Sequence, residues 1–180
     1  MRRGGAVLCD QLLSAIGALL MVERRAVTPE ITPEELSVLI FLVAGKQFAV
    51  EVNRVQHILD YQPPTRTPRR PLYVEGIIQH KGRYLPLVSL RKRLGVDTKE
   101  PEDRAILLLT MGHASLVGLV VDQVVRVLSL PAEKFLAPPP RVLGIRAEFI
   151  RGVANAGGRP VVWLDEAKLL TSEEPITLLA

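Results

Sequence analysis

The sequence predicts a mostly β protein that consists of two similar small barrels. From Ser37 onward the chain is a series of short apolar runs of strand length, rich in Val, Ile and Leu and separated by Gly, Pro, Asn or Asp. The same order of runs occurs twice. Short strands joined by tight turns close most economically into barrels, which leave no sheet edge exposed. Helical stretches are expected to be brief, at about 53–59, 91–94, 131–135 and 165–170.

Residues 1–36 are expected to form an N-terminal extension made of a helix and a linker. Apolar residues at near-helical spacing within 6–22 predict an amphipathic helix. This stretch is shorter than the about 20 residues that a membrane-spanning helix needs, and Asp10 interrupts it, so no membrane insertion is expected. A secretory signal that begins with Met-Arg-Arg is the alternative. Thr32 and Glu35 have the spacing of a capping box, which predicts a short helical turn before the first strand.

An internal repeat divides the body of the chain into two units. The segment Val50–Leu59 aligns with Leu119–Leu128, and the longer segment Glu75–Leu90 aligns with Arg151–Leu164. Each longer segment predicts a strand, a tight turn that contains glycine, and a second strand. Chance similarity between valine-rich strands is the alternative explanation.

The repeat sets the expected domain boundaries. One barrel is predicted from about 37–95 and the other from about 104–170, within a domain of residues 37–171. Residues 172–180 are then a C-terminal tail. Two barrels side by side leave a groove between them, which suits the docking of a partner better than catalysis.

The composition is that of a folded protein. Of the 180 residues 48% are hydrophobic and 23% are charged, which suits one domain or two small domains that share a core. The single cysteine, Cys9, excludes an intramolecular disulfide and is typical of a reducing compartment such as the cytoplasm. The net charge is only +4, but Arg66–Arg93 holds eight basic residues and one acidic residue, a local charge of +7. This segment predicts either a surface for an acidic partner or a solvated basic face.

No motif of a catalytic, metal or cofactor site is found in the sequence. The histidines His57, His80 and His113 stand far apart, and neither an HExxH helix nor a pair of cysteines is present. A nucleophile elbow and a phosphate-binding glycine loop are also absent. We therefore expect no enzyme and no cofactor, and an enzyme whose site no motif reveals is a remaining alternative.

A nucleic-acid-binding barrel is the alternative from another class of function. Small barrels bind single strands through basic grooves that carry aromatic stacking platforms. The segment 66–93 supplies the basic residues, but Tyr73 and Tyr84 are its only aromatic residues. The aromatic content of the chain is 4%, so this signal is weak.

Several stretches occur in the order found in one known family. They are FAVEVNRVQHIL, TRTPRRPLYVEGII, KGRYLPLVSLRKRLG, VGLVVDQVVRVLSLPAEKF and FIRGVANAGGRPVVWLDEAKLL. Over about 39–171 the sequence therefore resembles the chemotaxis coupling (CheW-like) domain. The resemblance implies a fold of two five-stranded SH3-like β-barrels.

The resemblance also implies a cytoplasmic adaptor without catalysis, acting at membrane-associated receptor arrays. Its implied partners are the regulatory domain of a chemotaxis-type histidine kinase and the cytoplasmic tip of a methyl-accepting chemoreceptor. The receptor helix would lie in the groove between the barrels. Neither a nucleic acid nor a cofactor is implied.

The family's partner contacts map onto two segments of this sequence, the turn at Val55–Leu59 and the strand and turn at Gly76–Gly82. The partner-binding residues implied by the resemblance are Val55, His57, Ile58, Gly76, His80, Lys81, Gly82 and Arg91.

This chain departs from the family pattern at three of the matched positions. His57 stands where the family often has glutamate, Lys81 stands where it has arginine, and Ser89 replaces an aspartate. Lysine keeps the positive charge of arginine but not its planar, two-pronged geometry. The departures make this region more positive, so we expect an acidic partner surface and binding that weakens with salt.

Overall fold

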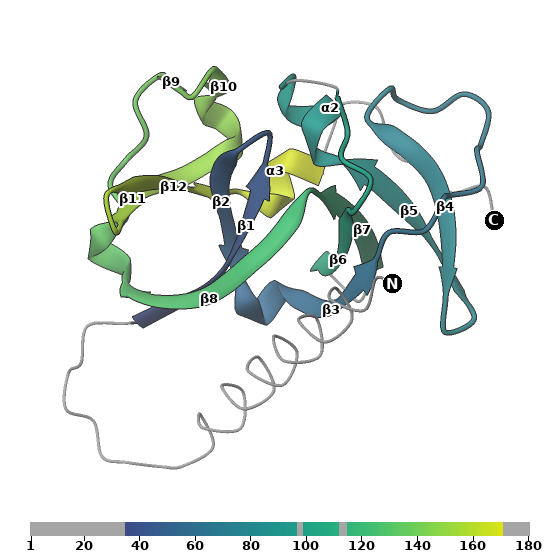
Figure 1. Cartoon of the computed structure of the whole chain (residues 1–180), viewed down its shortest axis with the longest axis horizontal. Helices are drawn as coiled ribbons and strands as arrows, with labels where there is room; N and C mark the ends of the chain where they lie inside the picture. The colour runs from purple at the N-terminus through teal and green to yellow at the C-terminus, as the bar shows by residue number, and fades with distance from the viewer. Residues whose placement is uncertain (1–34, 97–98, 112–114, 171–180) are drawn as a thin grey trace, which may run out of the picture.

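The computed structural model describes residues 35–96, 99–111 and 115–170. The predicted N-terminal helix and the C-terminal tail lie outside these residues. The described strands form two five-stranded sheets, each curved into a barrel, which lie side by side (Figure 1). The predicted fold class, mostly β with two barrels and short helices, is confirmed.

Barrel one contains the strands of the middle of the chain. Its hydrogen-bonded order is β3-β6-β7-β5-β4, in which β5 and β7 are parallel and the other neighbours are antiparallel. The bounds are β3 Val55–Asp60, β4 Val74–His80, β5 Arg83–Ser89, β6 Ala105–Met111 and β7 Ser115–Val121.

Barrel two combines strands from both ends of the described chain. Its order is β8-β1-β2-β12-β11, in which β2 and β12 are the parallel pair. The bounds are β1 Glu35–Val43, β2 Lys46–Glu51, β8 Gln123–Pro131, β11 Ile150–Ala156 and β12 Arg159–Leu164. A separate small hairpin pairs β9 (Arg141–Val142) with β10 (Ile145–Arg146).

The helices are short, as expected. They are α2 Leu90–Leu94 and α3 Glu166–Leu170, with 3-10 turns η1 Val52–Arg54, η2 Ala132–Lys134 and η3 Ala147–Phe149. The expected helical stretch at 53–59 is wrong beyond its first turn. Val55 and Ile58 instead lie in β3 and pack into the core.

The repeat is present in the structure, but the sheets differ from the predicted division into barrels of 37–95 and 104–170. The segment Val50–Leu59 runs from β2 of barrel two through η1 into β3 of barrel one, and Leu119–Leu128 runs back from β7 into β8. Each repeat therefore gives two strands to one barrel and three to the other. The largest buried cluster contains residues of both barrels, so the two barrels share one hydrophobic core.

Candidate partner-binding surface

Three of the eight predicted partner-binding residues meet where the two edges of barrel one come together. The strands β3 and β4 are at opposite ends of the hydrogen-bonded order, so side chains join them as the sheet curls. The Nζ of Lys81 lies 3.2 Å from Nε2 of His57. The rings of His57 and His80 have centroids 5.3 Å apart. We call His57, His80 and Lys81 the edge cluster.

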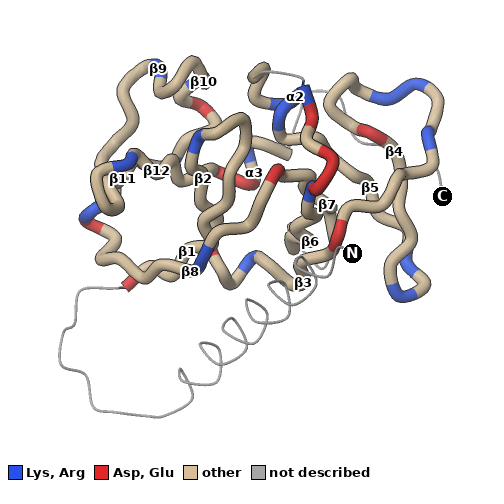
Figure 2. The backbone as a smooth tube through the Cα atoms, viewed as in Figure 1, with Lys and Arg blue, Asp and Glu red and all other residues tan. Residues whose placement is uncertain are grey.

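The β4–β5 hairpin forms a projecting arm (Figure 1), and His80 and Lys81 lie at its end. Lys81 and Gly82 form its two-residue turn, both with positive φ, of 48° and 75°. Turns of this kind match the twist of the flanking strands, and glycine at the second position is their usual residue. In Figure 2 the tip of this hairpin carries basic residues.

The structure separates the eight predicted partner-binding residues into exposed and buried positions. Lys81 and Gly82 are exposed, and His57 and His80 are half-buried. Four residues are buried: Val55, Ile58, Gly76 and Arg91. The surface that a partner can touch in this conformation is thus the edge cluster with its turn, and the other four residues lie beneath or beside it.

The protonation of His57 depends on its surroundings in the edge cluster. Burial lowers the pKa of His57, and the positive charge of Lys81 and the neighbouring His80 lower this pKa further. A neutral imidazole can accept a hydrogen bond from the lysine ammonium group through Nε2. The Nε2 of His80 is buried and has no hydrogen-bond partner within the described part of the chain.

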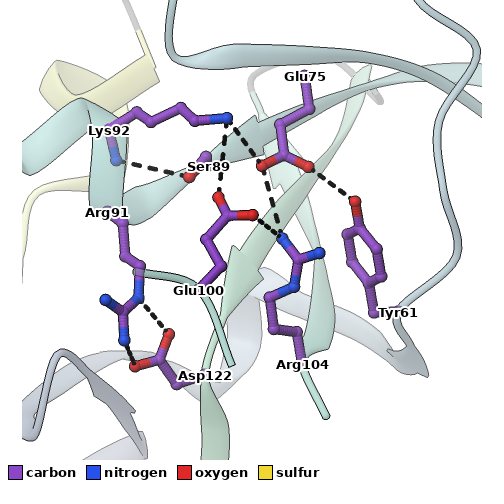
Figure 3. A network of polar contacts seen from close by, with 8 residues as sticks. All are labelled: Tyr61, Glu75, Ser89, Arg91, Lys92, Glu100, Arg104 and Asp122. Atoms are coloured by element: carbon purple, nitrogen blue, oxygen red, sulfur yellow. Dashed lines mark hydrogen bonds and ion pairs between the residues drawn. The ribbon is translucent and has the colours of Figure 1, made fainter. Parts of the chain in front are cut away.

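Arg91 joins the two barrels. Its guanidinium donates to both carboxylate oxygens of Asp122, at 2.8 and 2.6 Å. Asp122 stands where the chain crosses from β7 to β8, and its Oδ2 also accepts from the backbone N–H of Ala44 in the β1–β2 turn, at 2.7 Å. Figure 3 shows this two-pronged contact at the lower left.

A second polar network surrounds Glu75 at the start of β4 (Figure 3). One oxygen of Glu75 accepts from the hydroxyl of Tyr61 at 3.1 Å, and the other lies 3.4 Å from Nζ of Lys92. The guanidinium of Arg104 lies 3.8 Å from Glu75 and 3.7 Å from the centre of the Tyr61 ring. Burial and then Glu75 raise the pKa of Tyr61. The sequence reasoning did not find this network, although Glu75 is the one acid in the basic segment.

Most of the basic segment makes polar contacts within the protein. Five of its eight basic residues have partners in the described chain: Arg70, Lys81, Arg91, Lys92 and Arg93. The guanidinium of Arg93 lies 4.6 Å from the centre of the Tyr73 ring and 4.7 Å from that of Phe149, and it donates to the carbonyl of Leu169. The segment is therefore not one continuous basic face.

The described residues contain neither a cluster of metal ligands nor a membrane-spanning helix. No group of three His, Cys, Asp or Glu side chains in that part of the chain could hold a metal ion. None of the described helices is long and apolar enough to cross a membrane.

Three comparisons relate the chain to known proteins. The sequence is 31% identical to "Chemotaxis protein CheW" of Rhizobium meliloti over 74% of this chain and 86% of that protein. It is 28% identical to "Protein FrzA" of Myxococcus xanthus, over 77% and 85% of the two chains. The crystal structure of the scaffolding protein TtCheW from Thermoanaerobacter tengcongensis matches with a TM-score of 0.73 and 23% identity, covering 82% of this chain and 96% of that one.

The family model for the CheW-like domain matches residues 37–174, which include all strands of both barrels beyond the first two residues of β1. This match agrees with the double-barrel fold and with the resemblance found in the sequence. The chain belongs to the CheW-like domain family.

Proposed function

We propose that this protein is a non-catalytic adaptor that couples a chemoreceptor to a chemotaxis-type histidine kinase. The receptor would bind through its cytoplasmic tip and the kinase through its regulatory domain, in the cytoplasm at membrane-associated receptor arrays. Membership of the CheW-like family supports this proposal, and so do the chemotaxis names of the related proteins. The structural relative is described as a scaffolding protein.

The observation that carries the proposal is the exposed basic tip of barrel one. Lys81, Gly82, Arg83 and Tyr84 are all exposed, and the Tyr84 side chain retains 69% of its accessible surface. Arg83 has no polar partner in the part of the chain that the structure describes. A rigid hairpin that presents an aromatic ring among cations can anchor a protein partner whose surface is acidic.

The eight proposed site residues then fall into two roles. His57, His80, Lys81 and Gly82 would contact the partner. Val55, Ile58, Gly76 and Arg91 would hold that surface in place, because they are buried beneath it or bound to the rest of the protein.

The nucleic-acid alternative has no support from the comparisons. The CheW relatives are chemotaxis proteins by name, and the structural match is a scaffolding protein by name. Tyr73, one of the two aromatic residues in the basic segment, is stacked against Arg93 and half-buried, so it does not provide a free stacking platform.

A pull-down from the organism's own cells, followed by mass spectrometry, tests the proposal. The baits are the tagged wild type, Lys81→Glu, and Arg159→Glu. Arg159 is the counterpart of Arg83 on the β11–β12 hairpin of barrel two, so it controls for a change of surface charge. We expect wild type and Arg159→Glu to recover a histidine kinase and a methyl-accepting receptor, and Lys81→Glu to lose at least one of them.

Recovery of nucleic acid, or of unrelated enzymes only, by the wild-type bait would contradict the adaptor function. Equal recovery of kinase and receptor by all three baits would keep the adaptor function and reject this hairpin as the contact. Binding measured with purified partners should also weaken as salt rises, since charges at the rim of an interface are screened.

A further inference from the structure

We propose that the edge cluster is the binding site for a carboxylate side chain of the protein partner, and that the cluster takes up a proton when this carboxylate binds. The inference rests on the proposed function, because the partner is taken to be the receptor tip or the kinase regulatory domain. It adds the chemistry of the contact and a dependence on pH that the adaptor function alone does not require.

The geometry of the edge cluster suits one carboxylate. The Nζ of Lys81 and Nε2 of His57 are 3.2 Å apart, close enough for the two oxygens of one carboxylate to contact both nitrogens. Lys81 is exposed and has three N–H donors, one of which contacts the unprotonated Nε2 of His57 in the free chain. When Nε2 takes up a proton it becomes a donor, so the carboxylate replaces this contact and accepts from both nitrogens. The His80 ring packs on His57 and brings a third basic group to the same place.

The charged groups around His57 are almost all basic. The hairpin contributes His80 and Lys81. It also contributes Arg83, which stands opposite His80 in the register of β4 and β5. The facing strand β6 contributes Leu108, which is uncharged. On the segment of His57 itself the charged residues are Arg54 and Asp60, each three positions away.

No described carboxylate forms an ion pair with Lys81, so an anion for this lysine has to come from outside the described chain. A protein partner with an Asp or Glu at the matching position supplies it. A neutral or basic partner surface would bury the ammonium group of Lys81 without a counter-charge, which is costly.

The direction of the pH dependence follows from the same contacts. In the free chain burial, Lys81 and His80 lower the pKa of His57, so the imidazole is mostly neutral at neutral pH. A bound carboxylate favours the protonated ring and raises this pKa. The complex then holds more protons than the free proteins, so its affinity increases as the pH falls.

Calorimetric titration of the purified chain with the receptor tip fragment, and separately with the kinase regulatory domain, from the same organism tests the inference. Titrations run from about pH 8 to about pH 6, which spans the ordinary range of histidine. Each is done in two buffers with different ionisation enthalpies, which gives the number of protons taken up. The variants are His57→Gln, which keeps a neutral acceptor near Lys81, and Arg159→Glu as the matched control on barrel two.

We expect the affinity of the wild type and of Arg159→Glu for one partner to rise about three- to tenfold over this range, with net proton uptake. In His57→Gln the change in affinity should shrink to less than about twofold. If a histidine of the partner caused the pH dependence, the wild type and His57→Gln would show the same change. A flat pH profile in the wild type, or an unchanged profile in His57→Gln, overturns the inference and leaves the adaptor function standing. Failure of the wild type to bind either partner at any pH overturns both.

Discussion

The two barrels have the same strand order but opposite charge at the matching position of their hairpins. In barrel one this position is Glu75, which is buried and surrounded by Lys92 and Arg104. In barrel two the counterpart is Arg151, which lies 2.7 Å from Glu51. One barrel has an acid among bases, and the other has a base among acids.

This reversal shows that the fold accommodates a charge of either sign at this position when opposite charges lie beside it. Arg151 also forms ion pairs with Asp165 at 3.7 Å and Glu166 at 4.0 Å, which stand directly before α3 and at its first residue. In barrel one, Lys92 comes from the matching helix α2. In each barrel the short helix after the hairpin therefore supplies the counter-charge. Any sequence that exchanges both partners together keeps the ion pair.

The two hairpins have matching turns but different side chains at their tips. Barrel one has Lys81 and Gly82 at its turn, and barrel two has Gly157 and Gly158. Both turns have two residues, and all four residues have a positive φ. The fold thus leaves the side chain at the tip free to serve binding, and only barrel one carries a charged group there.

The largest effect we expect comes from the matched glycines Gly76 and Gly152. A Cβ at Gly76 would overlap the carbonyl oxygen of Thr65, whereas a Cβ at Gly152 would lie 3.0 Å from Cβ of Phe135. Gly76→Ala should lower the free energy of unfolding by about 4 kcal/mol, because backbone has to move. Gly152→Ala should cost about 1 kcal/mol. Urea unfolding of both variants gives the comparison, and equal losses would show that the two loops dock equally tightly.

The next largest difference is expected where the chain crosses between barrels. Asp122 and Asn53 are matched positions, but Asp122 binds Arg91 and the Ala44 N–H, while Asn53 is exposed. Asp122→Ala leaves a largely buried guanidinium without its partner and should cost about 3 kcal/mol. Asn53→Ala should change stability by less than about 0.5 kcal/mol. Thermal unfolding measures both, and a small effect of Asp122→Ala would mean that water replaces the lost carboxylate.

Much of this architecture could be predicted from the sequence, because it depends on local patterns. Valine-rich runs and the glycines of the hairpin turns predict the strands, and the alignment of Glu75–Leu90 with Arg151–Leu164 predicts the repeat. The matching strand order of the two sheets confirms that repeat. The sequence could not predict which strands share a barrel. The repeat has the same sequence pattern whether each copy forms its own barrel or the two copies exchange strands.

The candidate site was predictable only in part. Resemblance to the family pointed to the segments that hold His57 and Lys81, but not to their contact, because β3 and β4 meet only when the sheet closes. Burial of Arg91 against Asp122 joins residues 31 positions apart and leaves no local signal in the sequence. The network around Glu75 could not be predicted from the sequence for the same reason.

Removing the central charge of each ion network should have a smaller and unequal effect. Glu75 has a side chain that is 7% exposed, and Arg151 has one that is 32% exposed. Glu75→Gln should lower the free energy of unfolding by about 2 kcal/mol, because the lost charge lies in a largely buried site. Arg104 keeps Glu100 at 2.5 Å, so no buried guanidinium is left without a carboxylate. Arg151→Gln should cost less than about 1 kcal/mol, and more of that loss should vanish in high salt. Urea unfolding at low and high salt distinguishes the two, and equal costs would show that burial does not separate the networks.

The smallest effect concerns Glu166, the first residue of α3, which takes the place that the apolar Leu90 has at the start of α2. Burial raises the pKa of Glu166 despite hydrogen bonds and the charge of Arg151. The folded state therefore holds this proton more tightly than the unfolded chain, so the contribution of Glu166 to stability is full below its unfolded pKa and declines as pH rises through the folded pKa.

Glu166→Gln removes that decline. The variant should gain stability relative to wild type, by up to about 1 kcal/mol, between about pH 4 and pH 7. Thermal unfolding of both proteins across this range measures the difference. A variant that instead loses stability towards pH 7 would show that the carboxylate is ionised and that its attraction to Arg151 outweighs the cost of burial.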